Sequence, residues 1–167
     1  MAFPDDLLDL AQQLASLDGT NPRQATLRRS ISTAYYALFH LLISTATQNW
    51  NRVETQAAFG RFFEHSKMKS ACEKKVSELG EYFKGKPPDS PELTILKHLQ
   101  TVASTFVQAY HKRADADYDT SKQWTQTEVL LQIDAVAEAF KSWQMIKDEQ
   151  VAQIYLFSLL GKGRNQA

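Results

Sequence analysis

The sequence has little of several features that would point to a particular class of protein. It contains one cysteine, Cys72, so neither a disulfide framework within the chain nor a cysteine-cluster zinc site is possible. It has no excess charge of either sign, since 19 lysines and arginines balance 19 aspartates and glutamates. The chain as a whole therefore does not attract polyanions, and any nucleic-acid surface has to be a local patch.

A long apolar run is also missing. The longest one near the end, residues 154–160, is far shorter than the roughly 20 residues that span a bilayer. The opening stretch, MAFPDDLLDL, lacks the basic start and apolar core of a secretory signal. We therefore expect a cytoplasmic protein with no membrane partner.

Helical periodicity dominates the sequence that remains. No stretch holds the strict alternation of a half-buried strand, and the few glycines and prolines lie between long helical segments. The sequence therefore predicts an all-α fold. The expected helices span about residues 5–17, 22–49 with Asn21 as its cap, one or two in 53–83, 90–113 starting at Ser90, 125–147 capped by Thr125 or Thr127, and a short last one from about 149.

The segment RRSISTAYYALFH, residues 28–40, has the period of a helix but carries large side chains on two sides. Its apolar face consists of Leu27, Ile31, Ala34, Leu38 and Leu41. The opposite strip holds Arg29, Thr33, Tyr36 and His40, flanked by Arg28, Ser32, Tyr35 and Phe39. We expect this helix to be covered on both sides, because its second side is too aromatic to face water. That cover is either the core of a bundle, or another subunit or polar cleft.

These residues resemble a known family. The stretch LRRSISTAYYALFHLL, followed by AYHKRADADYD and an amphipathic helix, is similar to the HEPN domain (higher eukaryotes and prokaryotes nucleotide-binding) over about residues 21–147. The resemblance implies an up-and-down helical bundle of four to five main helices. It also implies a single domain over residues 1–167, in which an N-terminal helix and a short C-terminal helix flank the core.

The resemblance further implies a homodimer, formed here through the helix of residues 22–49 and the helix that ends near Arg113. Members of the family act as metal-independent ribonucleases, as toxins, or as partners of nucleotidyltransferases. Their catalytic motif is an arginine followed after four to six residues by a histidine, facing the dimer cleft. Arg113 matches the arginine, but Tyr118 stands near the place of the histidine, and no histidine follows His111.

We therefore expect a dimer that binds RNA or a nucleotide in a polar cleft at the subunit interface, with little or no catalysis. A tyrosine side chain, with an ordinary pKa of about 10, exchanges protons poorly near neutral pH. The catalytic residues are unknown; His40 and His111 are the nearby substitutes. Two alternatives stay open: a weak toxin-like ribonuclease that uses one of these histidines, and a protein-interaction module whose partner is, for example, a nucleotidyltransferase.

Arg113 is expected to contact phosphate, Asp117 to orient the arginine, and Tyr36 and His40 to stack or to donate hydrogen bonds. The candidate RNA- or nucleotide-binding residues are Arg29, Tyr36, His40, His111, Arg113, Asp117 and Tyr118. No cofactor is expected.

No metal site is expected either. Asp115, Asp117 and Asp119 alternate like the first ligands of a calcium loop, but Thr120 takes the place of its glycine and Gln126 that of its last glutamate. A capped polar turn after a helix is the favoured interpretation of this stretch.

The middle of the chain, residues 59–86, combines basic and aromatic side chains. They are Arg61, Lys67, Lys69, Lys74, Lys75, Lys84 and Lys86, with Phe59, Phe62, Phe63, Tyr82 and Phe83. This composition suits single-stranded RNA. Because four glutamates dilute the charge, a solvated helical face above a phenylalanine core is favoured. Cys72 falls on the apolar stripe of this segment and is expected to be a small core residue.

Overall fold

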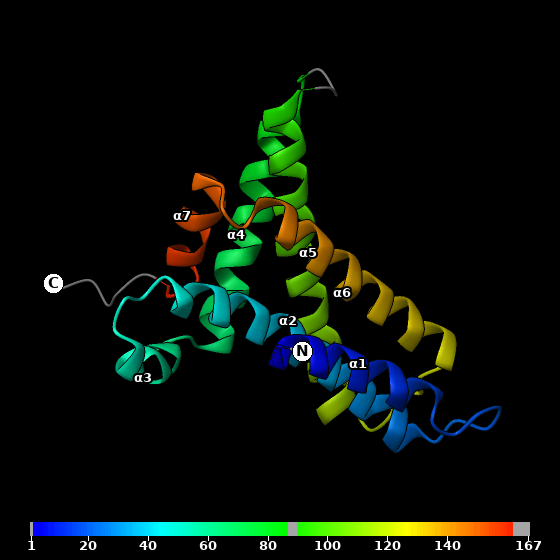
Figure 1. Cartoon of the computed structure of the whole chain (residues 1–167). Helices are drawn as coiled ribbons and strands as arrows, with labels where there is room; N and C mark the ends of the chain where they lie inside the picture. The colour runs from blue at the N-terminus through cyan, green and yellow to red at the C-terminus, as the bar shows by residue number, and fades with distance from the viewer. Residues whose placement is uncertain (1, 87–89, 162–167) are drawn as a thin grey trace, which may run out of the picture. The chain divides into compact units, whose positions relative to one another are not determined.

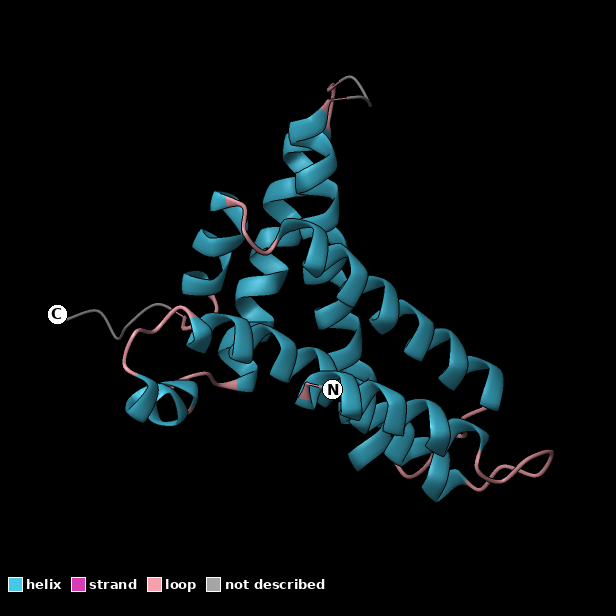
Figure 2. Ribbon diagram, viewed as in Figure 1, coloured by secondary structure: helices cyan, strands magenta, loops and turns pink. Residues whose placement is uncertain are grey.

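The computed structural model describes residues 2–86 and 90–161, and within these residues it contains helices and no strand (Figures 1 and 2). The all-α prediction is confirmed. The helices are α1 (Phe3–Ser16), α2 (Gln24–Gln48), a 3-10 turn (Val53–Thr55), α3 (Gln56–Gly60), α4 (His65–Phe83), α5 (Pro91–Tyr118), α6 (Gln126–Ile146) and α7 (Gln150–Ser158). Among the described residues, none of the helices has both the length and the apolar composition needed to cross a membrane.

The chain forms two compact units, each described here by itself. The first unit comprises Met1–Leu41 and Thr105–Phe140, and the second comprises Leu42–Ser104 and Lys141–Ala167. Helices α2, α5 and α6 each begin in one unit and end in the other. The single HEPN-like domain over the whole chain stays a prediction.

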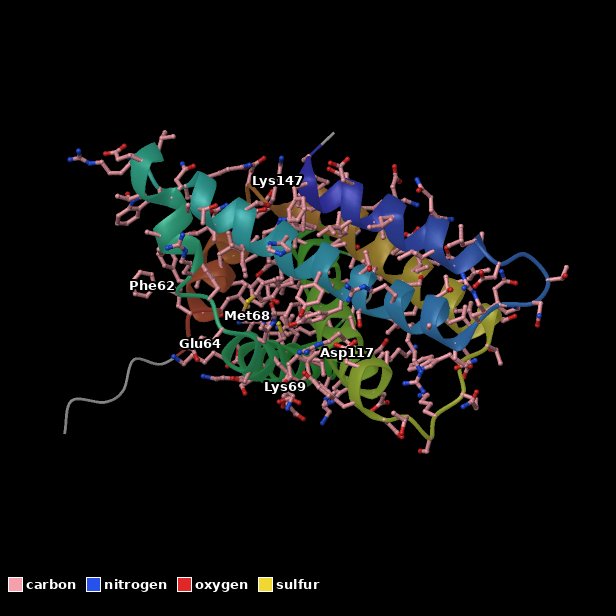
Figure 3. The ribbon with its side chains drawn as sticks, turned by 90° about the horizontal axis from the view of Figure 1, so that it is seen from below. Phe62, Glu64, Met68, Lys69, Asp117 and Lys147 are labelled. Atoms are coloured by element: carbon pink, nitrogen blue, oxygen red, sulfur yellow. The ribbon has the colours of Figure 1, made fainter. Side chains whose placement is uncertain are left out.

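In the first unit, α1 lies along the N-terminal half of α2 (Figures 1 and 3). Ala11 and Ala15, four residues apart on one face of α1, are completely buried, and their small side chains permit a close approach of the two helices. The approach is close enough for the Ser30 hydroxyl to donate a hydrogen bond to the Ala11 carbonyl at 2.7 Å. The predicted core face of α2 is confirmed, since all five of its apolar residues are buried.

The predicted cap at Asn21 is wrong, because α2 begins at Gln24. The side-chain amide of Gln24 donates to the Trp124 carbonyl at 2.8 Å, and its oxygen accepts from the Trp124 amide at 2.9 Å. The carboxylate of Asp18 accepts from the Arg23 amide at 3.1 Å. The start of α2 is thus held by a loop about one hundred residues away, which a local capping rule does not take into account.

Two other predicted helix starts are confirmed. At α6, the Thr125 hydroxyl accepts from the Glu128 amide at 3.2 Å, and the Glu128 carboxylate accepts from the Thr125 amide at 2.8 Å, which is a capping box. At α5, the Ser90 hydroxyl accepts from the Leu93 amide at 3.1 Å. In both cases the partners lie three residues apart, within reach of a local rule.

The core of the second unit includes the buried face of α4. Met68, Cys72 and Leu79 are buried there, which confirms Cys72 as a core residue. Its sulfur lies 3.0 Å from the hydroxyl of Tyr155, which is also buried. Burial raises the pKa of the Cys72 thiol to about 12, so the sulfur is not a nucleophile near neutral pH.

The aromatic residues between α2 and α4 divide between interior and surface. Phe63 is buried, and the ring of Phe59 stacks on that of Trp50 with centroids 5.2 Å apart. Phe62 is 69% exposed and points away from the chain (Figure 3). The predicted phenylalanine core is therefore confirmed for Phe63 and wrong for Phe62.

Candidate anion-binding site at the end of α5

The second side of α2 is covered in part: Tyr36 and His40 are half-buried and Arg29 is exposed, whereas Tyr35 is covered by α5 of the same chain. Tyr35 is fully buried and Phe39 nearly so. The Tyr35 ring centroid lies 5.5 Å from that of Phe106 and 6.1 Å from that of Tyr110, both on α5. Of the two interpretations, the bundle core therefore accounts for Tyr35 and Phe39.

Arg113 lies at the edge of this aromatic group, with its side chain only 12% exposed. The guanidinium carbon is 5.0 Å from the Tyr35 ring centroid and 5.4 Å from that of Tyr110. Both distances are within the range of cation–π interactions. Burial raises the pKa of Tyr35, so its hydroxyl stays neutral beside the arginine.

Asp117, labelled in Figure 3, lies one helical turn after Arg113 and joins α5 to α2. One carboxylate oxygen is 3.8 Å from Nη1 of Arg113, and the other accepts a hydrogen bond from the buried Ser32 hydroxyl. We call Ser32, Tyr35, Tyr110, Arg113 and Asp117 the Arg113 cluster.

The guanidinium of Arg113 is incompletely satisfied. Its Nε atom is buried and has no hydrogen-bond partner in the described part of the chain. Its 3.8 Å contact with Asp117 is longer than a hydrogen bond. The arginine therefore keeps hydrogen-bonding capacity for a further acceptor.

Arg28, which the sequence analysis did not select, determines where α5 ends. Its guanidinium donates to the carbonyl oxygens of Ala116 at 2.9 Å, Asp119 at 2.9 Å and Lys122 at 2.5 Å. Carbonyls at a helix C-terminus lack partners within the helix, and an arginine can supply them. The predicted end near Arg113 is thus wrong: α5 continues to Tyr118, and residues 114–118 are helical.

Tyr36 and His40 adjoin the Arg113 cluster through rings. The Tyr36 ring centroid is 5.3 Å from that of Tyr35, and the His40 ring lies 6.4 Å from Tyr36 and 5.1 Å from Phe3. Both side chains are half-buried. Desolvation lowers the pKa of His40, so the imidazole is neutral at pH 7.

The other three candidates are surface side chains. Arg29 and His111 are exposed, and the ring of His111 lies beside that of Tyr110, with centroids 5.6 Å apart. Tyr118, at the position near which the family has its histidine, is 77% exposed. The structure thus brings Arg113 and Asp117 together, and it leaves Arg29, His111 and Tyr118 on the surface. Tyr36 is next to Tyr35 of the cluster, and His40 is next to Tyr36.

The three alternating aspartates have different partners. Asp115 pairs with Lys122 at 3.7 Å, Asp117 belongs to the Arg113 cluster, and Asp119 accepts from the Ser121 amide at 3.0 Å. Within residues 2–86 and 90–161, no group of three or more histidine, cysteine, aspartate or glutamate side chains could hold a metal ion.

Comparison of the chain with protein-family models, curated proteins and solved structures gives no match. The resemblance to HEPN domains therefore stays a prediction, and the function has to be argued from the site itself.

Proposed function

We propose that the chain is a HEPN-like protein that binds RNA or a nucleotide through Arg113, with little or no catalysis. The observation that carries the proposal is the incompletely satisfied guanidinium: the Arg113 side chain is 12% exposed, its Nε has no hydrogen-bond partner among the described residues, and the Asp117 carboxylate is 3.8 Å from Nη1. A buried charge is costly unless it is paired and hydrogen-bonded. An added anion would supply the missing acceptors.

A phosphate group suits this arginine. The guanidinium carries five N–H donors in a planar fork that matches two oxygens of a phosphate. Contacts with the rings of Tyr35 and Tyr110 orient the plane of the guanidinium. The carboxylate of Asp117, one turn later on α5, restrains it as well. Because these neighbours fix the fork beforehand, little side-chain entropy is lost when an anion binds.

Little or no catalysis is proposed because Tyr118 stands near the place of the motif histidine. Desolvation lowers the pKa of His40, which disfavours its charged form and with it a role as general acid. The other nearby histidine, His111, is exposed on the surface of α5. We expect RNA incubated with the purified protein, with and without a chelator, to stay intact. Robust cleavage that is lost in His40→Ala or His111→Ala would instead favour the ribonuclease alternative.

The homodimer is part of the proposal, with fewer aromatic side chains to form its interface than the sequence predicted. Tyr35 and Phe39 are covered within the chain, so on α2 and α5, the helices of the predicted interface, the large apolar side chains left for a second copy are the half-buried Tyr36 and the exposed Tyr118. We expect sedimentation at micromolar concentration to show a dimer that Tyr36→Ala weakens. A wild-type chain that sediments as a monomer would remove the dimer from the proposal.

The direct test is anion binding by an Arg113→Met variant, in which methionine keeps packing against the two tyrosines. Binding of labelled single-stranded RNA and of ATP would be measured by fluorescence anisotropy and by competition, at about 50 and 200 mM salt. We expect Arg113→Met to weaken binding about tenfold or more and to lower the salt slope by about one.

Arg23→Met is the matched control, because Arg23 is an exposed arginine of the same unit, with a side chain 70% exposed. Thermal melting of each variant shows whether the fold is retained. If Arg113→Met melts earlier but binds like the control, then Arg113 is only a structural strut and the proposal is wrong.

A further inference from the structure

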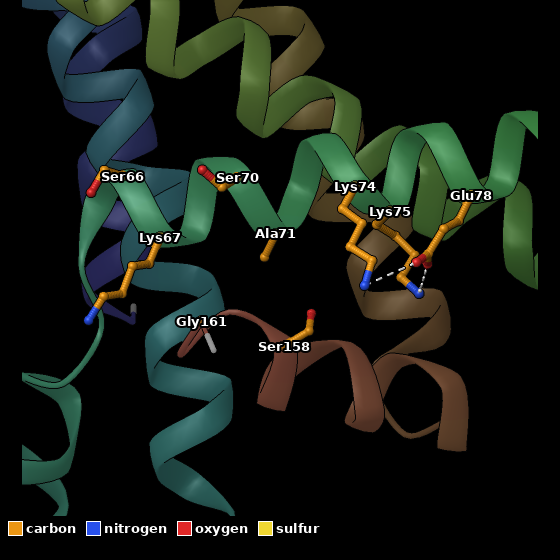
Figure 4. A pocket seen from close by; sticks show the side chains of 9 residues that line it. All are labelled: Ser66, Lys67, Ser70, Ala71, Lys74, Lys75, Glu78, Ser158 and Gly161. Carbon is orange, nitrogen blue, oxygen red and sulfur yellow. Dashed lines mark hydrogen bonds and ion pairs between the residues drawn. The ribbon is translucent and has the colours of Figure 1, made fainter. Parts of the chain in front are cut away.

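The second unit contains a basic groove between α4 and the turn that follows α7 (Figure 4). It has a volume of about 510 Å³, within the range of ligand sites in proteins. Its polar lining consists mainly of three lysines and three serines: Lys67, Lys74, Lys75, Ser66, Ser70 and Ser158. We call it the lysine groove.

Helical spacing gathers these lysines. Lys67, Ala71, Lys74 and Glu78 follow one another at intervals of four, three and four, so they lie along one face of α4. Figure 4 shows Ala71 between Lys67 and Lys74, with its methyl group toward α7. A small residue at the middle of the face leaves the groove open between the basic side chains.

Positive charge exceeds negative charge in the groove. The ammonium groups of Lys74 and Lys75 converge on one carboxylate, that of Glu78, at 3.6 and 3.0 Å (Figure 4). Lys67 pairs with Glu64, which is not part of the lining, at 2.6 Å. Three lysines thus face two glutamates at most, and an anion can neutralise the remainder.

The turn after α7 holds Lys67 in place. Gly161 has a φ of +76°, and a Cβ atom there would lie only 3.0 Å from Cδ of Lys67. The backbone therefore packs directly on the methylene stem of the lysine, in a conformation that favours glycine. The stem is held while the ammonium group stays accessible, with the side chain 44% exposed.

The serines add hydrogen-bonding groups. Ser66 and Ser70 are exposed, and neither hydroxyl has a hydrogen-bond partner in the part of the chain that the structure describes. The Ser158 hydroxyl donates to the Tyr155 carbonyl at 2.6 Å. Together with the lysines that line the groove, these hydroxyls are donors that suit the oxygens of a phosphate.

We propose that the lysine groove binds a phosphate group, carried by a free nucleotide or by an RNA strand, through Lys74 and Lys75, with Lys67 at the other end of the groove. Exposed lysine–glutamate pairs are weak, so an incoming phosphate competes with Glu78 at small cost. This inference does not depend on the proposed function, since it concerns other residues in the other unit.

The first test removes charge with the double variant Lys74→Gln/Lys75→Gln. The probes are inorganic phosphate, ATP and a labelled single-stranded RNA. We expect binding of at least one probe to weaken about tenfold, and the salt slope for RNA to fall by about one for each lysine removed. The control is Lys69→Gln, because Lys69 is on the same helix and pairs with Glu73 at 2.9 Å, outside the groove lining.

The second test predicts a gain. Glu78→Gln removes the carboxylate that competes with phosphate for Lys74 and Lys75, so affinity should rise about two- to fivefold. Glu73→Gln, which frees Lys69 instead, should leave affinity unchanged. A general effect of net charge would raise affinity equally in both variants and would overturn the proposal.

The probes also identify the source of the phosphate. A response of phosphate or ATP binding to these variants supports a free ligand, and a response of RNA binding alone supports a strand. If all three probes bind the double variant and Lys69→Gln with the same affinity, the proposal is wrong. It is also wrong if no probe binds either variant. Arg113→Met is measured separately, so failure of the lysine groove and failure of the Arg113 site can be told apart.

Discussion

The two basic regions of the chain differ in how their charges are held. In the first unit, Arg113 is almost buried, contacts two aromatic rings, and has a carboxylate no closer than 3.8 Å. In the second unit, the lysines of α4 are more exposed, and their glutamate partners on the same helix come as close as 2.9 Å. The shorter ion pairs are thus the more exposed ones.

This difference shows that the length of an ion pair does not measure its contribution to stability. Exposed pairs three or four residues apart on a helix stabilise by only about 0.3–0.5 kcal/mol, because water competes for both partners. Removing one partner of a buried pair leaves the other charge without compensation and costs several times more. We therefore expect the first unit to be sensitive to single charge changes and α4 to tolerate them.

The largest effect is expected at Arg28, which extends the comparison to a second arginine of the first unit. Arg28→Ala leaves three backbone carbonyls of α5 and the following loop without their donor. The free energy of unfolding should fall by about 3 kcal/mol, since hydrogen bonds to charged groups contribute about 1.5–3 kcal/mol each and are not additive. Urea denaturation measures this free energy of unfolding. Arg29→Ala, at the exposed neighbour, is the control and should change stability by less than about 0.5 kcal/mol.

Asp117→Ala should have the next largest effect. It removes the acceptor of the buried Ser32 hydroxyl and the only carboxylate found near Arg113 among the described residues. Because Asp117 is 30% exposed, the full cost of breaking a buried pair is reduced, and we expect a loss of about 2 kcal/mol. Asp115→Ala, two residues away and 48% exposed, is the control. If the two variants were equally stable, the claim that the less exposed Arg113–Asp117 pair contributes more to stability would be wrong.

Lys75→Ala tests the exposed side. Its ion pair with Glu78 is 3.0 Å long, shorter than that of Arg113 with Asp117, yet its removal should lower the free energy of unfolding by about 0.5 kcal/mol or less. Denaturation in low and in high salt checks this value, because screening removes the contribution of an exposed pair. A loss as large as that of Asp117→Ala would contradict the explanation by burial.

His40 gives the smallest effect, a dependence of stability on pH. Desolvation lowers its pKa below the ordinary value of 6.5 in the folded chain. Well above pH 6.5 the imidazole is neutral in both states. As the pH falls below 6.5, the unfolded chain takes up the proton first, so the free energy of unfolding decreases until the folded pKa is reached. Urea denaturation between pH 5 and 8 should show this decrease in the wild type and less of it in His40→Gln. His111→Gln is the control and should keep it.

What the sequence predicted correctly depends on residues close together in the chain. The helical period placed the buried face of α2 and put Cys72 in the core, and spacings of three residues identified the caps at Ser90 and Thr125. These features follow from helix geometry alone, so no distant partner has to be known.

The errors at the helix ends involve partners far away in the sequence. Gln24 pairs with the backbone of Trp124, and Arg28 holds carbonyls 88 to 94 residues later, so neither the start of α2 nor the end of α5 could be read locally. For the same reason the cover over Tyr35 could not be assigned to α5 or to a second subunit. At the candidate site, the pairing of Arg113 with Asp117 follows the four-residue helical spacing, whereas the contact of Asp117 with Ser32 needed the fold.

The end of α5 is attached to α2 at two points. Arg28 and Ser32 lie one turn apart on α2; Arg28 binds the carbonyl of Ala116 in the last turn of α5 and that of Asp119 just after it, and Ser32 binds Asp117. Helix ends usually fray, and their amides exchange hydrogen with solvent quickly. Here the last turn of α5 cannot open without breaking contacts to the middle of the first unit. Its amides should therefore exchange together with those of α2, so that the residues around Asp117 open as one cooperative segment with the helix that holds them.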